Sequence, residues 1–71
     1  MRQITTVKFF DMKSNSEAVL IIRTSKKEVS ICLSLFNAGD IEVRLSPQNV
    51  KQVIQGLEKA VNNVSDKGEE S

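Results

Sequence analysis

The feature that most constrains this chain is the long segment that begins at Ser46-Pro47. Serine is a preferred residue at a helix N-cap, and proline suits the first helical position because the N–H that it lacks would have no partner there. Apolar residues then recur at the three-and-four spacing of one helical face, with polar residues between them. The segment predicts an amphipathic helix whose apolar stripe consists of Val50, Val53, Ile54, Leu57, Val61 and Val64.

Two segments before this helix, residues 28–36 and 40–45, alternate apolar and polar side chains. Strict alternation is typical of half-buried strands. The residues Asn37-Ala38-Gly39 predict a three-residue hairpin loop between them, with the glycine in the left-handed conformation. In this register Leu35 pairs with Ile41 and every cross-strand pair on that face is apolar, whereas a slip by one residue would set a leucine against an acidic residue.

Two more strands are predicted nearer the N-terminus, over residues 17–24 and 3–10. A tight turn at Lys26 and Lys27 would pair Ile22 with Ile31 and extend the same apolar face. The predicted fold is therefore α+β: an antiparallel four-stranded meander followed by one C-terminal amphipathic helix packed on one sheet face. Residues 1–64 would form this single β-β-β-β-α domain, and residues 65–71, which lack apolar side chains, a disordered acidic tail.

The far face of the predicted sheet has an apolar centre within a charged rim. A contiguous apolar patch on so small a protein usually marks a contact. The contact could be the N-terminal segment folded back, a second copy in a homodimer, or a ligand. The residues predicted for such an interface are Val19, Ile21, Cys32 and Phe36.

A chain of 71 residues buries a marginal core, and small domains compensate with disulfides, metals or oligomerisation. The sequence has no His and one Cys, which leaves no disulfide within a chain and no ordinary zinc site. We therefore expect no cofactor, no metal and a homodimer. The longest apolar run, Ala18 to Ile22, is too short to span a membrane, and the free thiol favours a cytoplasmic location.

Catalysis is not expected. Cys32 is the one candidate nucleophile, and no histidine is present to activate it. Asp40 and Glu42 lie in or after a turn, and the three glycines are scattered rather than gathered in a phosphate-binding loop.

The stretch IEVRLSPQNVKQVIQGLEKAV, Ile41 to Val61, resembles the final strand and helix of small β-β-β-β-α modules that bind single-stranded nucleic acid. These are the positive-cofactor-four coactivator, Whirly and PUR types. The resemblance implies a dimer in which basic and aromatic residues of a curved sheet hold the strand. The residues of this chain that could take that role are Arg23, Lys26, Lys27, Phe36 and Arg44.

The sequence thus predicts a small non-enzymatic homodimeric binding module that contacts single-stranded nucleic acid through its sheet. The alternative is a protein-binding or small-ligand-sequestering adaptor, of the type that phages and mobile elements encode, which uses the apolar far face. The formal net charge of +1 suits the alternative, because a strong polyanion binder usually carries more positive charge. A purely structural subunit of a larger assembly is a third possibility.

Overall fold

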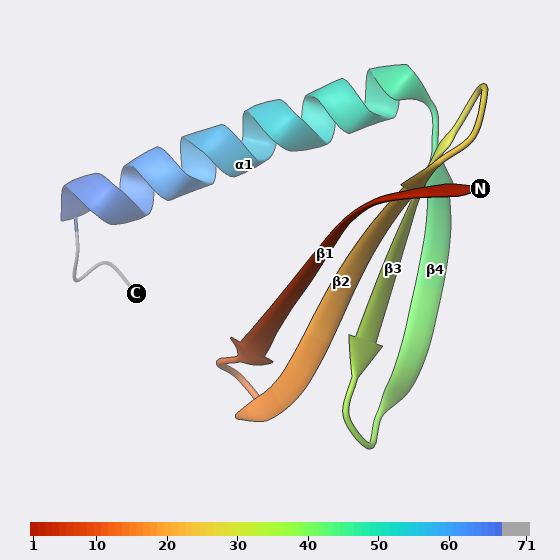
Figure 1. The fold of residues 1–71 in the computed structure, drawn as a ribbon. Helices are drawn as coiled ribbons and strands as arrows, with labels where there is room; N and C mark the ends of the chain where they lie inside the picture. Colours follow the sequence, from red (N-terminus) through yellow and green to blue (C-terminus); the bar gives the residue numbers. More distant parts are fainter. Residues whose placement is uncertain (68–71) are drawn as a thin grey trace.

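The computed structural model describes residues 1–67 and contains one sheet and one helix. The antiparallel sheet has the strands in chain order, β1-β2-β3-β4, and the helix follows the last strand (Figure 1). This confirms the predicted α+β meander with a C-terminal helix. The elements are β1 (Arg2–Asp11), β2 (Ser16–Thr24), β3 (Val29–Leu35), β4 (Gly39–Leu45) and α1 (Pro47–Lys67).

The pairing of β2 with β3 follows the predicted register. Ile22 lies opposite Ile31, and Leu20 lies opposite Leu33. Because side chains alternate along a strand, these pairs define one face, which we call the inner face, and their neighbours define the outer face. The inner face carries Val7, Phe9, Leu20, Ile22, Ile31, Leu33, Leu35, Ile41 and Val43.

The predicted pairing of β3 with β4 was wrong by two residues. Leu35 lies opposite Gly39, and Ile41 lies opposite Leu33. The loop is residues 36–38 instead of 37–39, and the Ala38 N–H donates to the Leu35 carbonyl at 3.0 Å. Asn37 at φ 67° and Gly39 at φ 95° both take left-handed conformations, which these residue types tolerate. Since the shift is an even number, every side chain keeps its predicted face.

The β1–β2 connection is held by Asp11. Its carboxylate accepts hydrogen bonds from the Ser14 hydroxyl and from the Ser14 N–H at 3.1 Å, while Asn15 takes a left-handed conformation. The hydrogen bond from the Ser14 hydroxyl, followed by that from the Ser14 N–H, lowers the pKa of Asp11. The charged form therefore stabilises this loop at neutral pH, and the stabilisation is lost as the pH falls through the lowered pKa.

The helix begins as predicted. The Ser46 hydroxyl accepts from the Asn49 N–H at 3.2 Å, and the Ser46 carbonyl accepts from the Val50 N–H at 3.0 Å. Ser46 is the one residue between β4 and α1. The helix ends at Lys67, within the segment 65–71 for which a tail was predicted, and residues 68–71 of that segment lie outside the described residues.

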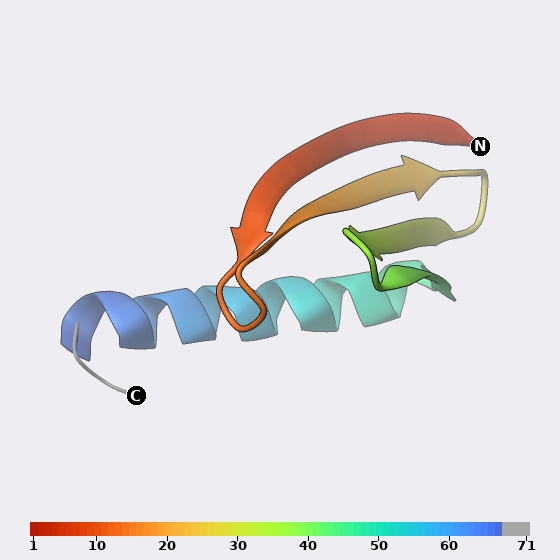
Figure 2. The same cartoon turned by 90° about the horizontal axis from the view of Figure 1, so that it is seen from below.

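Burial within a single chain is slight. Among residues 1–64, whose side chains the structure describes, only Ala18 and Ser30 are buried. The helix contacts the sheet at β4, and its C-terminal part projects beyond the sheet in both views (Figures 1 and 2). One copy of the chain therefore has the layers of an α+β domain without a closed core between them.

Candidate functional site

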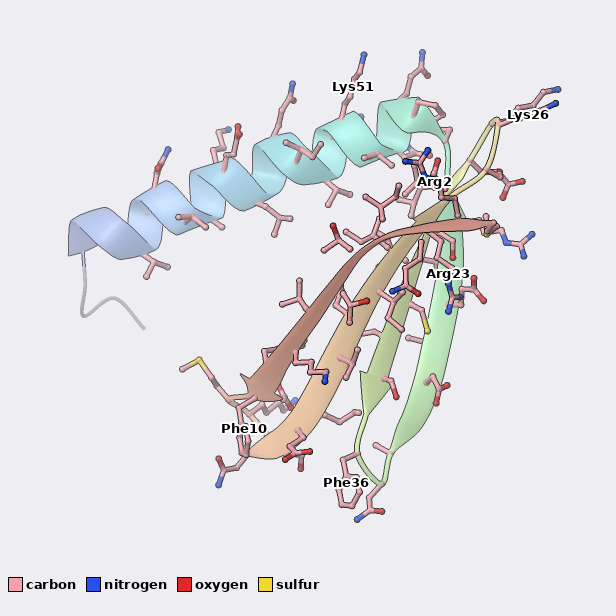
Figure 3. All side chains as sticks on the ribbon, in the orientation of Figure 1. Arg2, Phe10, Arg23, Lys26, Phe36 and Lys51 are labelled. Atoms are coloured by element: carbon pink, nitrogen blue, oxygen red, sulfur yellow. The ribbon has the colours of Figure 1, made fainter. Side chains whose placement is uncertain are left out.

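The first candidate surface is apolar and consists of the inner face together with the helix stripe of Val50, Val53, Ile54, Leu57, Val61 and Val64. Ile41 on the sheet is 63% exposed, and Leu57 on the helix is 60% exposed. In Figure 3 the side chains of α1 that end in nitrogen or oxygen, including Lys51, point to one side, and carbon-only side chains point to the other. Both apolar surfaces thus remain open to solvent in one chain.

A second candidate surface lies at the end of the sheet where β2 turns into β3. Strand pairing brings Arg2 opposite Thr24, the last residue of β2 before the loop. The β2–β3 loop itself carries two exposed lysines. Figure 3 shows that this end is opposite the one that bears Phe10 and Phe36. We call this surface the basic end and define it by Arg2, Arg23, Lys26, Lys27 and Arg44.

Two of these cations are held on the outer face around Ser30. Ser30 lies between Arg23 on β2 and Arg44 on β4, and it is completely buried. Its hydroxyl donates a hydrogen bond to the Glu42 carboxylate, and the Arg44 Nε lies 3.8 Å from the Glu28 Oε1. Two carboxylates therefore offset part of the positive charge on this face, and the ion pair of Arg44, being exposed, is weak.

The other three cations of the basic end, Arg2, Lys26 and Lys27, are exposed. A shallow depression lies beside them, lined by Met1, Arg2, Thr24, Ser25 and Lys26. Flexible cationic side chains around a depression, with their heads in water, are a suitable arrangement for contacts with phosphate groups.

The structure divides the set of residues that the sequence predicts for nucleic-acid binding. Arg23, Lys26, Lys27 and Arg44 gather at the basic end, whereas Phe36 lies in the β3–β4 loop at the other end. Phe36 is 65% exposed, and its N–H donates to the Glu17 carbonyl at 3.0 Å.

Two residues at these two ends of the sheet, Arg2 and Phe10, are not in the set predicted for nucleic-acid binding, although the sequence offers Phe10 as one of three rings on which bases could stack. Phe10 lies opposite Glu17, so the two exposed rings of Phe10 and Phe36 flank the same residue of β2. Arg2 joins the basic end because β1 pairs along β2. A register for these two strands, which the sequence reasoning did not assign, would have indicated both residues.

The predicted outer-face interface is also divided. Ile21 lies opposite Cys32, with Val19 two residues along the same strand, and all three side chains are half-buried. Phe36 lies beyond the end of β3 and does not belong to this centre. The remaining apolar centre is narrow, and charged or hydroxyl side chains surround it.

In the part of the chain that the structure describes, no group of three or more cysteine or carboxylate side chains gathers at a potential metal site. Within residues 1–67, α1 is the one helix, and it is not apolar enough over its length to cross a membrane. No family model matches the chain, and neither a curated protein nor a solved structure matches it.

Proposed function

We propose that this protein is a small non-enzymatic homodimeric module of the cytoplasm that binds single-stranded nucleic acid through its sheet. The observation that carries this proposal is the basic end, where five cationic side chains from β1, β2, β4 and the β2–β3 loop gather against two carboxylates. Contacts between such side chains and phosphates supply most of the affinity of non-specific nucleic-acid binding.

The opposite end of the sheet supports the same function. Proteins that bind single strands combine cationic side chains for the backbone with exposed aromatic rings on which bases stack. Phe10 and Phe36 are exposed there, and the seven residues of β3 separate the two ends by about 23 Å. A short single-stranded nucleic acid along the outer face would place phosphates near Arg23, Arg44 and the two loop lysines, and bases on the rings. Arg2, which pairs with Thr24, lies on the inner side of the same end.

The test is a titration of the protein with a fluorescent single-stranded oligonucleotide at several salt concentrations. If four or five phosphates are contacted, log K falls with log salt at a slope of about −3, since each contact on a single strand contributes about −0.7. No binding at low salt would contradict the proposal.

The exposed ring of Phe36 also favours the adaptor alternative. Titrations of three variants separate the two functions. An adaptor predicts that Phe36→Asp abolishes binding of a protein or small-ligand partner and that Lys26→Ala and Lys27→Ala change it little. A nucleic-acid module predicts that the lysine variants weaken oligonucleotide binding.

A further inference from the structure

We propose that a second copy of this chain completes the fold, because α1 of each chain packs its apolar stripe on the inner face of its partner's sheet. The inference rests on the homodimer in the function proposed above and names the surface that forms it. The helix of each chain would then lie on the sheet of the other chain. One isologous interface would therefore bury both the helix stripe and the inner face of each copy.

The exposed area of one chain is too large for a compact monomer. The accessible surface is 6121 Å², whereas a compact monomer of this mass exposes about 4,400 Å². The radius of gyration is 14.0 Å, compared with about 11 Å for a compact domain of this length. The excess area is about 1,700 Å² per chain, compared with roughly 800 Å² per partner in a standard interface. For two chains it is about 3,400 Å², which is within the range of total area that obligate dimers bury.

The chain cannot easily hide this area by folding its own helix onto its own sheet. Ser46 is the one residue between β4 and α1, and both its hydroxyl and its carbonyl accept hydrogen bonds from the first turn of the helix. Pro47 fixes its own φ and restricts the backbone of Ser46. The direction in which the helix leaves β4 is therefore set locally, and that direction carries it beyond the sheet (Figure 2).

The lengths of the two apolar surfaces lead to the same conclusion. From Val50 to Val64 the stripe extends for about 21 Å along the helix axis. The axes of the two edge strands are separated by about 14 Å, and the helix crosses the strand direction instead of following it (Figure 1). The end of the stripe near Val64, which is 63% exposed, therefore needs the sheet of another chain to cover it.

The chemistry of both surfaces favours an apolar occupant. The inner-face side chains of β2, β3 and β4 are uncharged, and so are those of Thr5, Val7 and Phe9 on β1. The side chains of the helix stripe are uncharged as well. A nucleic acid or a charged peptide would lose hydration there without gaining a partner for its charges. A second copy supplies uncharged, apolar surface on both its helix and its sheet.

The test links the two surfaces chemically in chains that carry Cys32→Ser. One preparation carries Leu57→Cys on the helix and the other Leu33→Cys on the inner face. The two are mixed, refolded together and treated with a bismaleimide crosslinker. We expect a covalent product of twice 7.9 kDa, in which mass spectrometry of the peptides finds position 57 linked to position 33. In this mixture such a link can form only between chains.

The matched control replaces Leu33→Cys with Ser34→Cys, its outer-face neighbour, and should give little of the corresponding link. Ile41→Cys is a second inner-face position if Leu33→Cys does not fold by circular dichroism. Absence of links to both inner-face positions, or equal linking to Ser34→Cys, would overturn the inference. Oligonucleotide binding plays no part in this readout, so failure of the nucleic-acid function would leave the result intact.

Discussion

Replacing Leu57 with glutamate is expected to dissociate the dimer and, with it, to unfold the chain at micromolar concentration. Leu57 lies at the middle of the helix stripe, where a partner's sheet would surround it. A large side chain at the centre of an interface contributes about 2 kcal/mol or more, and a two-fold dimer contains the residue twice. A loss of about 4 kcal/mol weakens the dimer about 1,000-fold. Light scattering measures the mass, and circular dichroism the folded fraction.

The control for this substitution is Gln55→Glu, on the polar side of the same helix. It introduces the same charge two residues away, at an exposed position that the proposed interface leaves in solvent. We expect this variant to keep the dimer mass and the melting temperature of the parent protein. If Leu57→Glu also kept both, the stripe would not be an interface.

Reversing the charge of both lysines in the β2–β3 loop is expected to have the second largest effect. Lys26→Glu together with Lys27→Glu removes two phosphate contacts and adds repulsion at the basic end. Affinity for a single-stranded oligonucleotide should fall about tenfold or more at low salt, and the slope of log K against log salt should become shallower by about 1.4. Fluorescence titrations at several salt concentrations measure both quantities, while the dimer mass should stay unchanged.

The matched control is the double variant Lys51→Glu and Lys59→Glu, which changes the net charge by the same amount. These two lysines lie on the polar side of α1, away from the sheet, as Figure 3 shows for Lys51. Oligonucleotide affinity should fall much less in this variant. Equal losses in the two variants would mean that total charge, and not the basic end, determines binding.

The helix and the strands could be predicted from the sequence because local patterns determine them. The Ser46-Pro47 start needs only the capping rules, and the pairing of Ile22 with Ile31 follows from a tight turn between two apolar segments. The pairing of β3 with β4 was predicted two residues off, because the loop conformation depends on Asn37 as well as Gly39. Both residues tolerate positive φ, and the sequence does not indicate that both adopt it.

The candidate sites were harder to predict, because residues far apart in the sequence form them. Arg2 reaches the basic end only through the pairing of β1 with β2. Phe36 lies apart from the four predicted cations, because the β3–β4 loop places it at the opposite end of the sheet. The helix stripe was predicted correctly as an apolar surface. The three-and-four spacing of its apolar residues indicates a surface that is buried in the folded protein. The spacing does not indicate whether the same chain or a second copy covers that surface.

The most direct test of the central claim, that two copies share one core, is the mass of the unmodified protein in solution. Light scattering at micromolar concentration should give twice the chain mass of 7.9 kDa, and the melting temperature should rise with protein concentration, because folding is coupled to association. A mass of 7.9 kDa with a cooperative melting transition independent of concentration would contradict the account.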